Sequence, residues 1–239
     1  SIMTHKTLVF VSSYEATNNY IFSIIKNKLK FRYYIITTKP GSNYFKKRKI
    51  NNFEVKNFTQ LENKINDLSP DFLFTIPQFP DSIENKSLEL ANKYNIKSIT
   101  AVDNWFPLKE RFKRKEKPIK YLNTDFILVN DQKVKSELKN IYKEKKIICT
   151  GNPYLEQRWS KSYLANIKNK YSSRKGLFKD TILFISEPYS ELSTRNKKII
   201  NPGFSEINIL GKIIQVIDKK FKIYIKLHPS ENKKKYYII

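Results

Sequence analysis

Short runs of β-branched and aromatic residues alternate with segments of helical periodicity along most of this chain. Such alternation is typical of βαβ units, in which each helix carries the chain back to begin another parallel strand. The expected strands are Thr7–Ser13, Phe31–Thr37, Asp71–Thr75, Ile96–Val102, Asp125–Val129 and Lys146–Thr150. The expected helices are Ala16–Leu29, Phe58–Leu68, Asp81–Tyr94 with Asp81 as its N-cap, and Asp131–Tyr142. The sequence therefore predicts an α/β fold with a doubly wound parallel sheet and helices on both faces.

A polar segment rich in Lys and Ser interrupts this alternation over Arg158–Lys179, and a strand–helix–strand pattern then begins again. The elements expected there are the strands Thr181–Ser186 and Phe221–Leu227 and the helix Gly203–Lys219. We therefore expect two Rossmann-like units, of which the second is short. The expected division is an N-terminal domain over 1–157, a linker over 158–179 and a partial C-terminal domain over 180–239.

The composition limits the classes of partner. Lys and Arg total 46 against 22 Asp and Glu, which gives a formal net charge of +24. A positive field of this size attracts phosphates, anionic lipid surfaces and nucleic acids, although an AT-rich coding bias would also raise the Lys, Asn, Ile and Tyr content. One cysteine and two histidines favour neither a disulfide framework nor a metal site.

Several sequence signals are absent. No apolar run approaches the roughly 18–20 residues of a membrane helix, and no apolar leader precedes the first strand. The first strand is not followed by the G-x-G-x-x-G fingerprint of dinucleotide sites, and no zinc-finger or RNP-type signature appears. We expect a cytoplasmic protein without a cofactor or a bound metal, and nucleic acid is not the expected partner.

Ligands of open α/β sheets bind where the strands end, and two such places in the first unit carry polar residues. Ser12–Ala16 leaves the first strand, and Glu15 within it is either a general base or a first-turn acid favoured by the helix dipole. Asp103, Asn104 and Arg111 follow a later strand. They can form a substrate wall of acid, amide and cation, or simply cap a helix beside a core aromatic residue.

The turn Thr150–Pro153 contains Gly151 and Asn152. Glycine permits a tight turn there, and proline can open the next helix at its first position. Exposed amides at a helix N-terminus form an anion site. A plain βα turn explains the same residues equally well.

The last expected strand runs into Lys226, His228, Pro229 and Ser230. A histidine can donate a hydrogen bond or a proton near neutral pH, and the neighbouring lysine and serine suit a phosphate or a leaving oxygen. The same histidine also fits a structural role.

Taken in order, several segments resemble bacterial surface-polysaccharide biosynthesis proteins, namely GT-B-type glycosyltransferases and relatives of the non-hydrolysing sugar-nucleotide epimerases. The segments are SITAVDNWFPLKERF, TDFILVNDQKVKSEL, KIICTGNPYLEQ, ILFISEP, PGFSEINIL and YIKLHPSE, within roughly Asp71 to Glu231. The Thr-Gly-Asn turn resembles that of the epimerases, and the His-Pro motif resembles that of bacterial sialyltransferases and polyol-phosphate polymerases. The sialyltransferase Asp/Glu-Asp/Glu-Gly motif and the epimerase H-R-x-E-N segment are absent.

This resemblance implies a donor nucleotide held in a cleft between two Rossmann-like lobes. The residues that it implies on the donor side are His228, Pro229, Ser230, Gly203, Phe204 and Glu206. Those that it implies on the acceptor side are Asp103, Asn104 and Arg111.

The resulting hypothesis is a metal-independent, nucleotide-sugar-dependent glycosyltransferase of cell-surface polysaccharide synthesis. Lys226 and His228 would stabilise the leaving nucleotide, and Glu15 or Asp103 would deprotonate the acceptor hydroxyl. The expected partners are a nucleotide-sugar donor, a glycan or lipid-linked acceptor and, through basic surfaces, the inner face of an anionic membrane. The alternative is a non-catalytic basic polyanion-binding or scaffold protein with the same fold.

Overall fold

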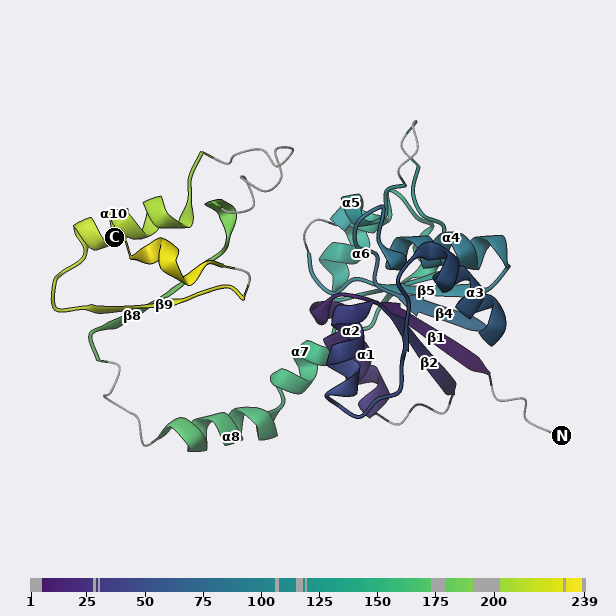
Figure 1. Ribbon diagram of the computed structural model, residues 1–239, viewed down its shortest axis with the longest axis horizontal. Helices are drawn as coiled ribbons and strands as arrows, with labels where there is room; N and C mark the ends of the chain where they lie inside the picture. Colours follow the sequence, from purple (N-terminus) through teal and green to yellow (C-terminus); the bar gives the residue numbers. More distant parts are fainter. Residues whose placement is uncertain are drawn as a thin grey trace. The chain divides into compact units, whose positions relative to one another are not determined.

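Figure 1 shows the computed structural model of the chain, coloured along the sequence. It describes residues 6–27, 29, 31–105, 108–114, 118, 120–172, 179–190, 203–229 and 231–237. The chain divides into two compact units, Ser1–Leu164 and Ala165–Ile239. The division falls within helix α8 (Lys161–Ser172), inside the segment that the sequence predicts to be a linker.

Among the described residues, a seven-stranded sheet forms the centre of the first unit (Figure 1). Its strand order is β3-β2-β1-β4-β5-β6-β7, and all neighbouring strands are parallel. The strands are β1 (Thr7–Ser12), β2 (Arg32–Thr37), β3 (Phe53–Glu54), β4 (Phe72–Thr75), β5 (Lys97–Ala101), β6 (Phe126–Val129) and β7 (Ile147–Cys149). The chain moves outward from β1 to β3 and then reverses past β1, which confirms the doubly wound α/β fold.

Helices cover both faces of this sheet. They are α1 (Glu15–Lys26), α2 (Lys39–Lys46), α3 (Phe58–Leu68), α4 (Ile83–Lys93), α5 (Leu108–Arg111), α6 (Gln132–Leu138) and α7 (Pro153–Arg158). Along β1, Leu8 and Phe10 belong to one buried cluster while Val9 and Val11 belong to another. Because successive side chains of a strand point to opposite faces, this alternation shows that both faces of the sheet are buried.

The register of the central strands aligns their carboxyl ends. Ser12 pairs with Thr37 of β2, and Val11 pairs with Thr75 of β4. The turns that follow β1, β2 and β4 therefore leave from the same edge of the sheet. In doubly wound folds this edge is where ligands bind.

The first unit differs from the sequence expectations at several elements, among them α2 and α4. Helix α2 was not predicted, since Pro40 and Gly41 lie in its first turn, where a helix tolerates them but sequence patterns favour a turn. Asp81 is not the N-cap of α4, because the cap is Ser82, whose hydroxyl accepts a hydrogen bond from the Asn85 amide at 3.2 Å.

The second unit contains a single described βαβ unit. Its elements are β8 (Thr181–Ile185), α10 (Glu206–Val216) and β9 (Lys222–Lys226), and the two strands are parallel. Leu210 of α10 is buried, whereas Leu183, Ile185 and Tyr224 are exposed on the strands. Leu183 and Tyr224 pair in register, and Ile185 lies two residues beyond Leu183, so the three share one uncovered face. None of the helices in the described ranges has the length and hydropathy that crossing a membrane requires.

Candidate active site

A pocket of about 380 Å³ lies at the carboxyl edge of the first sheet and brings together three separate turns. Glu15 comes from the start of α1, Asp103 and Asn104 from the turn after β5, and Asn152 from the turn after β7. The other lining residues are Ala16, Asn19, Tyr20, Tyr154 and Leu155. Four residues that the sequence proposed at separate strand ends therefore surround one pocket.

Glu15 is exposed at the rim of this pocket, in the first turn of α1. Its carboxylate makes no hydrogen bond or ion pair within the described part of the chain. Glu15 therefore presents an accessible carboxylate that can accept a proton from a bound hydroxyl.

Asp103 is in a different situation, because it forms a buried ion pair. Its Oδ1 accepts a hydrogen bond from Arg111 Nη1 at 2.5 Å, and each side chain is only 8% exposed. A buried pair of this kind loses its balance of charge if either partner is removed. The structure thus pairs Asp103 with Arg111, and this ion pair stabilises the turn after β5. The Arg111 side chain is buried and does not face solvent.

Gly151 and Asn152 form the turn into α7. Gly151 has a φ of 77°, a left-handed conformation that favours glycine. Asn152 Oδ1 accepts hydrogen bonds from the Tyr154 and Leu155 amides at 3.0 and 3.3 Å, and its Nδ2 donates to the Asp103 carbonyl at 3.0 Å. Asn152 thus occupies amides that an anion at this turn would need, and it ties two walls of the pocket together.

Trp105 follows Asn104 and presents a half-exposed ring at the same edge of the sheet. Its Nε1 donates to Asp131 Oδ2 at 2.6 Å, while Asp131 Oδ1 caps α6 at the Val134 amide, 2.9 Å away. The Val134 and Trp105 hydrogen bonds lower the pKa of Asp131. The indole is therefore held in place by an ionised cap.

The sequence did not single out Tyr20, which lines the pocket from α1. Its burial raises the pKa of the phenol to about 12, although a hydrogen bond with Thr150 acts in the opposite direction. Tyr20 therefore stays protonated and is a hydrogen-bond donor at neutral pH. The one available signal was the polar run Thr17–Tyr20 inside a helix whose neighbours are apolar.

Glu84 is a second residue that the sequence did not indicate. It is fully buried in the first turn of α4, and its Oε1 accepts hydrogen bonds from the Ser13 amide at 2.6 Å and the Ser13 hydroxyl at 2.7 Å. Burial raises the pKa of this carboxyl group, despite the hydrogen bonds from Ser13. Glu84 fixes the turn after β1, directly before Glu15.

In the second unit, Lys226, His228 and Pro229 are exposed where β9 ends, and Ser230 lies outside the described residues. The His228 amide donates a hydrogen bond to the Glu231 carboxylate. The backbone of this turn is thereby fixed while the imidazole remains at the surface.

Glu206 is directed inward. The Lys235 ammonium forms ion pairs with both Glu206 and Glu231, and Ser190 and Ser186 donate hydrogen bonds to these two carboxylates. Burial alone would raise the pKa of Glu206, but the hydrogen bonds from Lys235 and Ser190 outweigh it and hold the pKa at about 2. Glu206 thus joins the start of α10 to Ser190, which follows β8, and to Lys235 near the C-terminal end of the described residues, rather than facing solvent.

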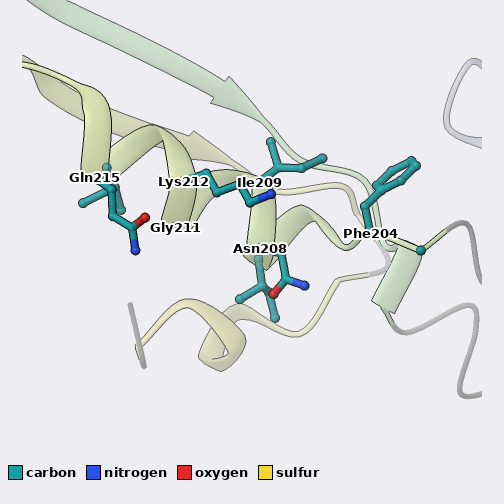
Figure 2. A pocket seen from close by; sticks show the side chains of 9 residues that line it. Phe204, Asn208, Ile209, Gly211, Lys212 and Gln215 are labelled. Atoms are coloured by element: carbon teal, nitrogen blue, oxygen red, sulfur yellow. The ribbon is translucent and has the colours of Figure 1, made fainter.

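Gly203 and Phe204 begin a groove of about 640 Å³ along α10. Figure 2 shows its side chains, from Phe204 before the helix to Gln215 near the end of α10. Phe204 is half-exposed and makes an edge-to-face contact with Tyr189, with ring centroids 5.7 Å apart. Within the described ranges, no group of three or more His, Cys, Asp and Glu side chains is placed to hold a metal ion.

The architecture places the chain in the GT-B-like class of α/β folds. No protein-family model matches the sequence, and no curated protein is significantly similar to it. Solved structures do share the fold. The S. aureus MnaA–UDP co-structure has a TM-score of 0.60 at 14% identity, over 94% of this chain and 62% of that one.

Two further structures show the same likeness. Methanocaldococcus jannaschii UDP-GlcNAc 2-epimerase, in complex with UDP-GlcNAc and UDP, has a TM-score of 0.61 at 15% identity, over 93% of this chain and 66% of that chain. The wall teichoic acid polymerase TagF has a TM-score of 0.50 at 16% identity, over 93% and 56%. The present chain thus spans less than two thirds of each of these proteins. At these identities the likeness shows the fold.

Proposed function

We propose that this protein is a nucleotide-sugar-dependent glycosyltransferase of cell-surface polysaccharide synthesis. The observation that carries the proposal is the accessible Glu15 carboxylate on a pocket at the ligand-binding edge of a GT-B-like sheet. The fold likeness supports it, because the similar structures include proteins bound to UDP and to UDP-GlcNAc.

In the proposed reaction, the oxygen of an acceptor hydroxyl forms a bond to the anomeric carbon of the donor sugar. The bond from that carbon to the donor phosphate oxygen breaks, and the nucleoside diphosphate leaves with the electron pair. Glu15 takes the hydroxyl proton. Asp103 is the weaker candidate for this base, because Arg111 already neutralises its carboxylate.

We assign the donor phosphate to the turn after β9. Lys226 and His228 are exposed there, and Glu231 fixes the backbone of the turn. A cation and a hydrogen-bond donor at this position would stabilise the negative charge that develops on the leaving nucleotide. Gly203 and Phe204, at the start of the α10 groove, are assigned to the nucleoside part of the donor.

We also propose that α8 and Trp159, two residues before it, contact an anionic membrane, where lipid-linked acceptors would lie. Trp159 is 71% exposed, and Leu164 and Ile167 are exposed on α8. At about 100° per residue, Leu164 and Ile167 lie roughly 60° apart on the helix, with Lys168 on one side of them and Lys170 on the other. An apolar stripe bordered by lysines is typical of helices that lie in a membrane interface.

The first experiment is a thermal-shift panel of CMP, CDP, UMP, UDP, GDP, ADP and heparin at low and high salt. A ligand that binds only the folded state raises the melting temperature. We expect one nucleotide to give a shift that survives high salt. A shift by heparin alone that disappears with salt would instead support the polyanion-binding alternative.

Variants then show which residues are responsible for the thermal shift caused by the nucleotide. We expect His228→Ala and Lys226→Gln to reduce it, whereas Lys222→Gln, the same charge change at the other end of β9, leaves it unchanged. In a transfer assay with the donor so identified, Glu15→Gln should lower kcat by about 10²–10⁴-fold without weakening nucleotide binding. The control is Glu137→Gln, an exposed acid of α6. An equal effect of both carboxylate variants would count against Glu15 as the base.

A further inference from the structure

A second cavity, of about 390 Å³, lies beside the candidate active site and shares Glu15 with it. Ser13 and Asn18 reach it from the end of β1 and from α1, and Tyr44, Lys47 and Arg48 reach it from α2 and the residues after it. We refer to it as the anion pocket. Nothing in the sequence pattern indicated it, because α2 itself was not predicted.

The anion pocket carries two cations without acidic partners. Neither Lys47 nor Arg48 forms an ion pair within the part of the chain that the structure describes. Arg48 is nevertheless held in place, because its guanidinium carbon lies 3.6 Å from the centre of the Tyr44 ring and its Nη1 donates to the Tyr44 carbonyl at 3.1 Å. A guanidinium fixed in this way loses little freedom when an anion binds.

Asn18 supplies a buried donor to the same cavity. The side chain lines the anion pocket although the residue is only 1% exposed. Its Oδ1 accepts the Ser12 hydroxyl, while its Nδ2 has no hydrogen-bond partner among the described residues. A β-carbon at Gly41 would lie 3.3 Å from this Nδ2 and would overlap the Thr37 hydroxyl, so the glycine keeps the space open. The Nδ2 amide is therefore available to donate a hydrogen bond to an acceptor oxygen bound in the cavity.

Ser13 adds a group of the opposite kind. Its hydroxyl proton is donated to the buried Glu84 carboxyl group at 2.7 Å. The oxygen of Ser13 therefore remains as an acceptor on the cavity wall, where it suits a hydroxyl group of a ligand. Cations, a free amide donor and one hydroxyl acceptor together match an oxyanion attached to a polyhydroxylated molecule.

We propose that the anion pocket binds the oxyanion of a phosphorylated glycan, and that this glycan is the acceptor substrate. Its role as acceptor rests on the proposed function, whereas binding of the oxyanion does not. Because Glu15 borders both cavities, an acceptor anchored by its phosphate would place a neighbouring sugar hydroxyl at the Glu15 carboxylate. The phosphate would thereby contribute to orienting the hydroxyl that reacts.

The test is isothermal titration calorimetry of the whole chain at low salt with three probes: inorganic phosphate, glucose 6-phosphate and glucuronate. We expect glucose 6-phosphate to bind more tightly than inorganic phosphate, since it adds a hydroxyl contact at Ser13. Tighter binding of glucuronate than of either phosphate would identify a carboxylate as the oxyanion and overturn the phosphorylated ligand.

Matched variants distinguish specific binding in the anion pocket from non-specific attraction of an anion to the positively charged protein. Arg48→Gln and Lys47→Gln should each weaken glucose 6-phosphate binding by about 10-fold or more, because a charge-assisted hydrogen bond is lost. Lys26→Gln removes the same charge from the far end of α1 and should change it by less than about 2-fold. Equal weakening by all three variants, or no effect of Lys47→Gln and Arg48→Gln, overturns the proposal.

Nucleotide-binding measurements distinguish the anion-pocket proposal from the proposed glycosyltransferase function. Arg48→Gln should leave the nucleotide thermal shift intact, and His228→Ala should leave glucose 6-phosphate binding intact. If nucleotides bind and the phosphate probes do not, the anion pocket is wrong while the donor assignment stands. If the phosphate probes bind and no nucleotide does, the oxyanion site stands without the transferase.

Discussion

The two units use the same βαβ pattern but bury it to different extents. The first sheet has apolar clusters on both faces, so that neighbouring residues of β1 are buried in opposite directions. The second sheet is covered on one face and exposes Leu183, Ile185 and Tyr224 on the other. Alternation of strands and helices therefore specifies the local unit, whereas helices packed on both faces of the first sheet decide how much of it is buried.

The polar side chains near the carboxyl ends of the strands also differ between the two units. In the first unit, Glu15 and Asn18 keep polar atoms available at two pockets. In the second unit, the carboxylates of Glu206 and Glu231 both form ion pairs with Lys235. Polar side chains near the strand ends thus line pockets in the first unit, whereas in the second unit they hold the backbone together.

The largest expected effect comes from the buried pair of the first unit. Arg111→Ala leaves the Asp103 carboxylate buried without its partner and should lower the free energy of unfolding by about 3–5 kcal/mol. Urea denaturation measures it. The exposed pair Lys97–Asp125 is the control, since Lys97→Ala should cost about 1 kcal/mol or less. Similar losses in both variants would show that the Asp103–Arg111 pair is not buried in solution.

A matched leucine pair tests the difference in burial between the units directly. Leu73→Ala removes a fully buried side chain of β4 and should cost about 2–5 kcal/mol. Leu183→Ala acts on an exposed side chain of β8 and should cost about 0.5 kcal/mol or less. A large cost at Leu183 in denaturant titrations would mean that its face of the second sheet is covered in solution.

Lowering the pH should change the stability contributed by one carboxyl group in each unit, and the two changes should have opposite sign. The folded pKa of Glu206 is about 2, below the ordinary value of 4.5. Its contribution to stability is therefore complete above the unfolded pKa and is lost as the pH falls from about 4.5 toward 2. The pKa of Glu84 is raised by burial, so its contribution becomes more favourable as the pH falls.

The measurement is unfolding of the Glu206→Gln and Glu84→Gln variants between pH 7 and pH 2. Glu206→Gln should flatten the loss of stability on acidification, and Glu84→Gln should steepen it. The same pH profile for both variants would contradict the opposite placement of the two carboxyl groups.

The smallest expected effect concerns α8, which the division between the units crosses. In a Trp105→Phe background, Trp159 is the only tryptophan, and its emission should shift to the blue with phosphatidylglycerol vesicles but not with phosphatidylcholine vesicles. Lys168→Gln and Lys170→Gln should each weaken vesicle binding by about 5-fold, from about 1 kcal/mol per lysine. Lys56→Gln, an exposed lysine of the first unit, is the control. Equal binding to both lipids would contradict an anionic surface as the partner.

Much of the fold could be predicted from periodicity alone. The strand Arg32–Thr37 and the helix Phe58–Leu68 stand where their apolar spacing placed them, within one residue. The two-residue strand β3 and the helix Lys39–Lys46 were not found. The first is too short to show a period, and Pro40 and Gly41 conceal the second.

The sequence by itself determined which residues reach the ligand-binding edge, because a polar residue directly after an apolar strand has few other places to go. It thereby indicated Glu15, Asp103 and Asn152. Only the tertiary structure decided what each of them does, since that depends on partners far away in the chain. Arg111 neutralises Asp103, the Asp103 carbonyl accepts a hydrogen bond from Asn152, and Glu15 has no hydrogen bond or ion pair among the described residues. The same physical reason explains why the anion pocket was not foreseen: its walls meet only when α1 and α2 pack side by side.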